Sequence, residues 1–124
     1  EKARRGKTPT DVWWNTIVPT RGRERTGYPT QKPLAVVERI VRVHSNPADL
    51  VLDFFAGSGT LGEAAARSGR SYVLVDSNAE AVRIMAKRLA FSEPTLEMVP
   101  GPSPTPGRSP EPGRVVRLRS RRGQ

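Results

Sequence analysis

The sequence predicts an α/β domain in which parallel strands pack against helices. Two short apolar runs, 50–52 and 72–75, lack the polar alternation of a half-exposed strand, and segments with helical periodicity separate them. A glycine-rich turn, GSGTLG at 57–62, follows the first run. Such a turn is typical of the point where a parallel strand leads into a helix. The 124 residues are enough for one small domain.

Composition divides the chain into three zones. Residues 1–29 are a basic lead-in segment, and residues 30–91 hold nearly all of the periodic pattern. Residues 92–124 are rich in Pro, Gly and Arg. Because such a composition buries little apolar surface, this third zone is expected to be a disordered tail.

The first predicted helix begins near Pro33, since proline suits the first helical position. Its apolar residues recur at helical spacing, and Asn46-Pro47 ends it. These apolar positions are Leu34, Val37, Ile40 and Val41. The run 50–52 then forms the first buried strand.

The second helix is expected to run from about Thr60 to a stop at Gly69, and the second strand, 72–75, ends at Asp76. The S-x-x-E spacing of residues 77–80 predicts a capping box at the start of a third helix. The buried face of that helix is formed by Val82, Met85, Ala86 and Leu89.

Charge and composition limit the classes of partner. The chain carries 21 Lys and Arg against 12 Asp and Glu, and this net charge of +9 favours a polyanionic partner, nucleic acid above all. There is no cysteine and a single histidine, His44, so no metal site is expected. No apolar run approaches the roughly 20 residues of a membrane span, and a soluble cytoplasmic protein is expected.

The residues beside the glycine turn discriminate between two kinds of ligand. Asp53 lies four residues before Gly57, where its carboxylate would repel the two phosphates of a dinucleotide. S-adenosylmethionine (SAM) carries no phosphate, and its ammonium and sulfonium groups are attracted by a carboxylate. Asp76 lies 19 residues after Gly57, close to the spacing of an acid that binds ribose hydroxyls. SAM is therefore favoured over a nicotinamide cofactor.

Two motifs carry a family resemblance. DFFAGSGT at 53–60 resembles the SAM-binding motif of DNA methyltransferases that modify N6 of adenine or N4 of cytosine. YPTQKP at 28–33 is similar to the second cofactor motif of that family. It precedes the glycine turn, as in the permuted members of the family. DVWW at 11–14 also resembles the segment leading into that motif. The resemblance covers residues 11 to about 91 and implies a partial Rossmann-like, SAM-dependent methyltransferase fold.

The resemblance also implies roles for single residues. Thr30 and Lys32 would serve the methionine carboxylate of SAM, Asp53 its amine and Asp76 its ribose. Gly57 and Gly59 would line the floor of the site, and Phe54 or Phe55 would form either a wall of the pocket or part of the core. The expected cofactor-binding residues are Thr30, Lys32, Asp53, Phe55, Gly57, Gly59, Thr60 and Asp76.

The catalytic motif of the resembled family is not found in this sequence. That family holds the flipped base with Asp, Asn or Ser followed by Pro-Pro and an aromatic residue, and the chain contains no Pro-Pro pair. No catalytic residue is therefore assigned. The chain is expected to supply the cofactor-binding part of a DNA methyltransferase and to be inactive alone. The catalytic half is expected elsewhere in the same polypeptide or on another chain. The alternative is a non-catalytic, nucleic-acid-binding remnant of such an enzyme.

Overall fold

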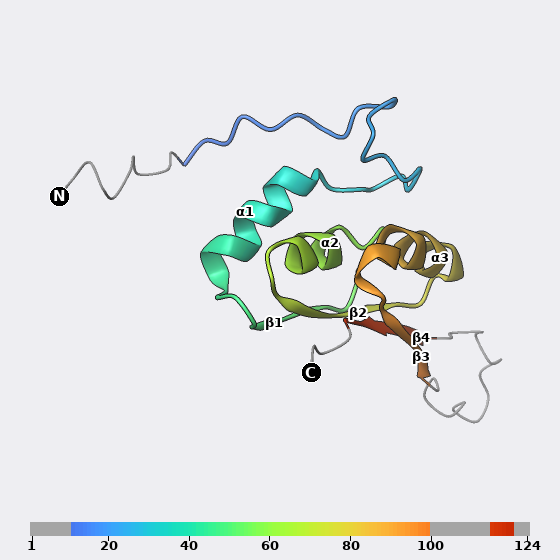
Figure 1. The fold of residues 1–124 in the computed structure, drawn as a ribbon. Helices are drawn as coiled ribbons and strands as arrows, with labels where there is room; N and C mark the ends of the chain where they lie inside the picture. Colours follow the sequence, from blue (N-terminus) through green and yellow to red (C-terminus); the bar gives the residue numbers. More distant parts are fainter. Residues whose placement is uncertain (1–10, 100–114, 121–124) are drawn as a thin grey trace, which may run out of the picture.

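The computed structural model of the protein describes residues 11–99 and 115–120 (Figure 1). Helices and strands alternate along the first part of the chain, and two further strands follow. The elements are α1 (Leu34–His44), β1 (Leu50–Asp53), α2 (Thr60–Arg67), β2 (Ser71–Asp76), α3 (Ala79–Arg88), the 3-10 turn η2 (Ala90–Ser92), β3 (Thr95–Val99) and β4 (Val115–Arg119).

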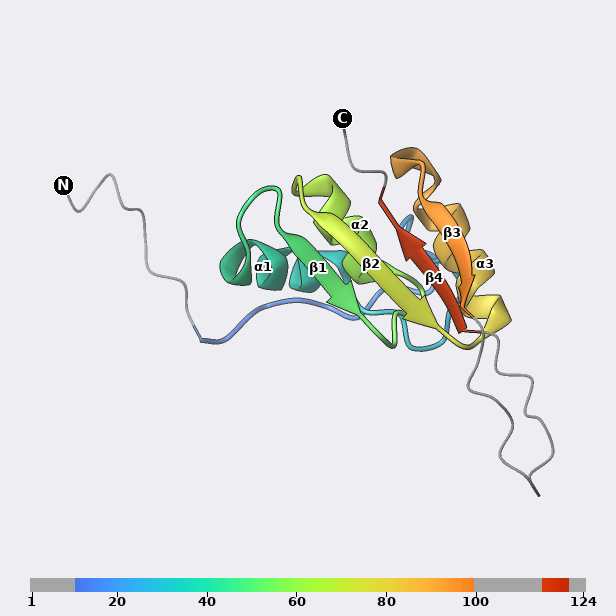
Figure 2. The same cartoon turned by 90° about the horizontal axis from the view of Figure 1, so that it is seen from below.

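The four strands form one sheet in the order β1-β2-β4-β3. β1 and β2 are parallel, with Leu50 beside Ser71, whereas β4 is antiparallel to both β2 and β3. All three α-helices cover one face of the sheet, and the view from below shows the strands in front of them (Figures 1 and 2). Within the described residues no helix covers the other face, where Leu50 and Leu52 are exposed.

The structure confirms the predicted helices and parallel strands between residues 34 and 89. Gly69 ends α2 as expected, with a positive φ of 75°. The Arg70 amide donates to the Ala65 carbonyl and the Gly69 amide to the Ala66 carbonyl, at 2.8 and 3.2 Å. These two bonds form a Schellman motif and satisfy the carbonyl groups at the helix end.

The core lies between the helices and β2. The largest side chains that are fully buried come from β2, from α3 and its C-cap, and from β4; they are Tyr72, Leu74, Met85, Leu89 and Leu118. The Tyr72 hydroxyl is satisfied by a 2.6 Å hydrogen bond with Ser92 Oγ. The apolar stripe predicted for the third helix is therefore at the centre of the fold.

The prediction of a disordered tail over residues 92–124 is wrong for two segments, since 95–99 and 115–119 are strands β3 and β4. Both alternate in sequence, and their register pairs Leu96 with Leu118 while Arg117 pairs with Glu97. Composition hid this alternation, because proline, glycine and arginine dominate the surrounding sequence. Residues 100–114 and 121–124 of the expected tail lie outside the described residues.

The predicted capping box at 77–80 is also corrected. The N-cap of α3 is Asn78 rather than Ser77, and its side chain accepts from the amides of Glu80 and Ala81 at 2.8 and 3.4 Å. The Asn78 amide donates to Asp76 Oδ1 at 2.8 Å. Asparagine is as good a cap as serine, and this bond to Asp76 favours the start at Asn78.

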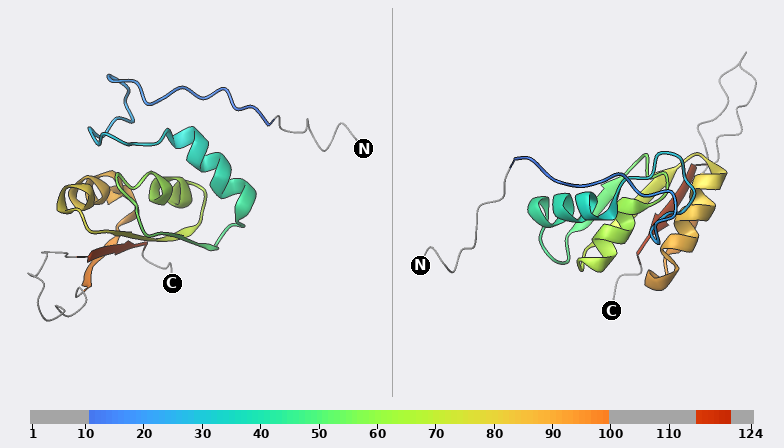
Figure 3. Two further views of the ribbon diagram at one scale, coloured as in Figure 1. Left: turned by 180° about the vertical axis from the view of Figure 1, so that it is seen from behind. Right: turned by 90° about the horizontal axis from the view of Figure 1, so that it is seen from above.

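Residues 11–33, which precede α1, run over the outer side of the helices (Figure 3). The Arg39 guanidinium of α1 lies 4.3 Å from the centre of the Trp13 ring, within range of a cation–π contact. Gln31 donates from Nε2 to the Glu24 carbonyl and accepts from the Thr26 amide, which closes a loop over α2 and α3. Over residues 11–99 and 115–120, no helix has the length and apolar character to span a membrane.

Candidate functional site

The carboxyl ends of the two parallel strands bring Asp53 and Asp76 to one edge of the sheet. The register of β1 and β2 pairs Asp53 with Leu74, two residues before Asp76. The glycine turn leaves β1 at this edge, and the Ala56 amide donates to the Val75 carbonyl at 3.1 Å. Ligands of open parallel sheets bind at such an edge, so the topology makes it the candidate site.

Gly57 is held in the turn by Asp76. Its φ is +52°, which favours glycine, and its amide donates to Asp76 Oδ2 at 2.8 Å. A β-carbon on Gly57 would lie 3.0 Å from Tyr28 Cε1. The turn therefore packs closely against the YPTQKP segment, a contact that the sequence did not predict.

Gly59 has a different environment, although it also has a positive φ of 74°. A β-carbon there would lie only 2.6 Å from Met85 Cγ in α3. Gly59 therefore allows the N-terminus of α2 to lie against α3, and it does not line the cavity described next.

A cavity of about 350 Å³ lies between the YPTQKP segment, α1 and the glycine turn. Its walls include six of the eight predicted cofactor-binding residues, and the exceptions are Gly59 and Asp76. The six are Thr30, Lys32, Asp53, Phe55, Gly57 and Thr60. Two segments that are distant in the sequence thus form one cavity.

The cavity offers polar groups of both charges and one exposed aromatic ring. Asp53 Oδ1 accepts from the Phe55 amide at 2.9 Å. For Asp53 Oδ2, the Thr30 hydroxyl and the Lys32 ammonium, no hydrogen-bonding partner is found in the described part of the chain. Phe55 is 92% exposed and Phe54 is exposed as well, so neither ring belongs to the core. These groups can bind a ligand that carries both an anion and a cation.

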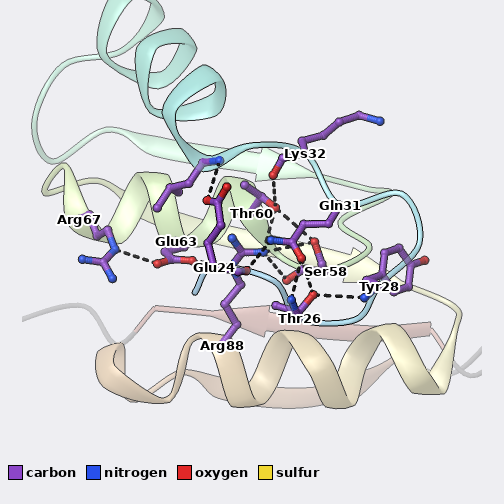
Figure 4. Close-up of polar contacts among 11 residues, drawn as sticks. Glu24, Thr26, Tyr28, Gln31, Lys32, Ser58, Thr60, Glu63, Arg67 and Arg88 are labelled. Carbon is purple, nitrogen blue, oxygen red and sulfur yellow. Dashed lines mark hydrogen bonds and ion pairs between the residues drawn. The ribbon is translucent and has the colours of Figure 1, made fainter. Parts of the chain in front are cut away.

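Behind the cavity, a second set of polar residues joins α2 to α3 (Figure 4). Arg88 of α3 pairs with Glu63 of α2 and donates to the Thr60 hydroxyl, and Glu63 also accepts from Arg67. Sequence reasoning did not identify this network. Only the spacing of Glu63 and Arg67, four residues apart on one helix, signalled part of it.

Known proteins resemble most of this chain. A family model described as DNA methylase matches residues 1–87. DNA adenine methyltransferase YhdJ of Escherichia coli (strain K12) is 42% identical over 83 residues, which cover 67% of this chain and 28% of that protein. Type II methyltransferase M2.LlaDCHI of Lactococcus lactis subsp. cremoris is 39% identical over 84 residues, 68% of this chain and 31% of that protein.

Among solved structures, the crystal structure of the M1.HpyAVI–SAM complex matches with a TM-score of 0.56 and 37% sequence identity. The match covers 68% of this chain and 42% of that one. The chain therefore spans less than half of that protein and under a third of the two relatives named above. The matched segment includes both cofactor-type motifs, and the chain belongs to the DNA methylase family.

Proposed function

We propose that this chain is the SAM-binding part of a DNA methyltransferase that modifies N6 of adenine or N4 of cytosine. The observation that carries the proposal is the cavity in which Thr30, Lys32 and Asp53 meet beside the glycine turn. SAM supplies an electrophilic methyl group on a sulfonium centre. The residues of this chain bind and orient that cofactor.

The free polar groups of the cavity match the methionine end of SAM. The Lys32 ammonium and the Thr30 hydroxyl can donate to its carboxylate, and Asp53 Oδ2 can accept from its amine. The same carboxylate disfavours a dinucleotide, whose phosphates are negative. Family membership and the likeness to a chain crystallised with SAM support this assignment.

The remaining assigned residues define the other parts of the binding surface. Gly57 presents backbone without a side chain, and the exposed ring of Phe55 offers an apolar face. Asp76 is assigned to the ribose hydroxyls, in addition to the bonds it accepts from Gly57 and Asn78. Gly59 and Thr60 contribute by shaping the first turn of α2.

Methyl transfer also requires a catalytic half that holds the target base. We propose that this half lies elsewhere in the same polypeptide or on a second chain. The exocyclic nitrogen must be held by acceptors and the flipped base must be stacked. The sequence contains no Pro-Pro pair, and it covers 28% and 31% of the two relatives described above. We therefore expect this chain alone to transfer no methyl group.

A second candidate function is a nucleic-acid-binding remnant without catalysis. The net charge of +9 is consistent with this alternative, because contact with DNA phosphates does not require a reaction. The reading frame separates the two functions. An Asp, Asn or Ser followed by Pro-Pro and an aromatic residue, encoded next to this chain, supports the enzyme.

Calorimetric titration of the 124-residue chain with SAM, with its demethylated product and with NAD tests the cofactor. We expect binding of SAM and of the product, and none of NAD. Asp53→Asn should weaken SAM binding, whereas Asp49→Asn, at the other end of β1, should leave it unchanged. Binding of NAD without SAM would overturn the proposal.

A methylation assay with radiolabelled SAM tests the division of labour. We expect no incorporation into DNA by the 124-residue chain, and transfer to an adenine or cytosine amine once the missing half is supplied. Binding of DNA by the chain alone should be indifferent to sequence and fall steeply with salt. Sequence-specific methylation by this chain alone would contradict the proposal.

A further inference from the structure

We propose that Arg88 is a positioning residue for the SAM site, acting through the hydroxyl of Thr60. The inference rests on the proposed function, because it assumes that SAM binds beside the glycine turn. Arg88 does not line the cavity, so it would hold the turn in place from behind instead of contacting the cofactor.

Arg88, at the end of α3, is bonded to both α2 and the glycine turn. Its side chain is only 5% exposed, and its Nε pairs with Glu63. Its Nη1 reaches the glycine turn, at 3.0 Å from Thr60 Oγ1, 3.3 Å from Ser58 Oγ and 3.5 Å from the Ser58 carbonyl (Figure 4). The last residue of α3 is thus bonded directly to the turn that precedes α2.

The Thr60 hydroxyl passes this contact on to the second cofactor motif. Because it accepts from Arg88, its own proton is available for the Lys32 carbonyl, which lies 3.4 Å away. Ser58 Oγ lies 3.2 Å from the same hydroxyl. Arg88, Thr60 and Lys32 therefore link α3, the glycine turn and the YPTQKP segment, and both of the latter form walls of the cavity.

The chemistry of the site explains why this residue is arginine. Guanidinium nitrogens lie in one plane at fixed separation, so Nε can pair with Glu63 while Nη1 serves the two hydroxyls. A lysine has a single nitrogen and can satisfy one side only. Glu63, 12% exposed, balances the buried charge and takes its second partner from Arg67.

Arg67 provides a matched control, because it pairs with the same carboxylate but makes no hydrogen bond or ion pair with residues 57–60, and its side chain is 54% exposed. In the 124-residue chain, we compare Arg88→Lys with Arg67→Lys by calorimetry with SAM and by amide hydrogen exchange of residues 57–60. Arg88→Lys should weaken SAM binding about ten-fold and speed exchange in the turn. Arg67→Lys should change the affinity about two-fold or less and leave the exchange unaltered.

A second pair of variants tests the route through the hydroxyl. Thr60→Val removes it, and Thr60→Ser keeps it. Exchange in the turn should be fast in Thr60→Val and close to normal in Thr60→Ser. In the Thr60→Val background, Arg88→Lys should add little to the loss of affinity, since the two residues act as one unit.

The outcomes separate this inference from the proposed function. If the unmodified chain binds no SAM, the proposed function fails, and amide exchange alone then decides whether Arg88 orders the turn. If SAM binds but Arg88→Lys and Arg67→Lys behave alike in both affinity and exchange, the inference is overturned and Arg88 is only a buried ion-pair partner. If Arg88→Lys does not fold, amide exchange of residues 57–60 in the two Thr60 variants tests the inference instead. Equal exchange rates in Thr60→Val and Thr60→Ser would overturn the inference.

Discussion

The β1–β2 half of the sheet differs from the β4–β3 half in strand direction and in what it carries. β1 and β2 are parallel. Both aspartates of the candidate site lie at the carboxyl ends of these strands, and the glycine turn follows β1. β4 runs antiparallel beside β2, pairing Val116 with Asp76 and Leu118 with Leu74. It supplies none of the predicted site residues, yet Leu118 is fully buried.

This comparison separates binding from stability. The parallel half bears the turn and the charges that a cofactor would contact, since only parallel strands bring successive carboxyl ends to one edge. In the antiparallel half, β4 pairs with the edge of β2 that β1 leaves free, and its Leu118 completes the core. We therefore expect mutations in the β4–β3 half to alter stability, and mutations at the sheet edge to alter affinity.

The largest expected effect is on stability, in the antiparallel half. Leu118→Ala should lower the free energy of unfolding by about 2–5 kcal/mol, because it empties a fully buried position against β2. Leu96→Ala, in register beside it but half-exposed, should cost clearly less. Urea unfolding measures both, and calorimetry should find SAM affinity unchanged in the folded protein. A negligible loss for Leu118→Ala would show that β4 is not part of the core.

The two α2-flanking glycines should respond unequally to alanine. Gly59→Ala should destabilise by about 2–4 kcal/mol, since the new methyl group would overlap Met85 and the φ is positive. Gly69→Ala has the same backbone penalty but nothing within 4 Å of the β-carbon, so about 1 kcal/mol is expected. Thermal unfolding compares the two variants. Equal losses would mean that the packing of α2 against α3 tolerates the methyl group.

At the edge of the parallel half, Asp76→Ala should weaken SAM binding by about 1–3 kcal/mol, the cost of losing a charge-assisted hydrogen bond. Asp76→Asn keeps an oxygen that can accept from the Gly57 amide, so it separates the support of the turn from the proposed ribose contact. Calorimetry with SAM measures both variants. An unchanged affinity in Asp76→Ala would remove this residue from the ribose role.

The smallest effect concerns Tyr72, whose neighbours come from both halves of the fold. Burial raises the pKa of its phenol above the ordinary value of 10.0, although the hydrogen bond with Ser92 lowers it in part. As the pH rises, the Tyr72 phenol therefore ionises first in the unfolded chain. The contribution of Tyr72 to the free energy of unfolding is fully present below about pH 10 and falls as the pH rises toward the folded-state pKa. Urea midpoints of the unmodified chain and Tyr72→Phe should converge above that pH. Parallel midpoints throughout would contradict the pKa shift.

Much of the fold and of the candidate site could be predicted from the sequence, because the signals are local. Helical periodicity located α1, α2 and α3, and the apolar runs located β1 and β2. Continuous apolar strands separated by a helix predicted their parallel pairing. The glycine turn and YPTQKP, joined by their family resemblance, predicted six residues that line one cavity. The helices and strands were predicted from spacing within single elements, whereas the cavity residues were predicted from two motifs joined by the family resemblance.

Tertiary structure alone decided the features that depend on distant partners. β3 and β4 are separated in sequence by residues 100–114 and pair with each other in the sheet. Their alternation of polar and apolar residues is too short to predict strands by itself, and β4 is placed in the sheet by its pairing with β2, where Leu118 lies beside Leu74. Asn78, and not Ser77, is the N-cap of α3, because the Asn78 amide donates a hydrogen bond to the Asp76 carboxylate. Arg88, 28 residues from Thr60, looks like an ordinary charge at a helix end. Only folding removes it from water and brings Glu63 and the glycine turn within hydrogen-bonding distance, which no local spacing can encode.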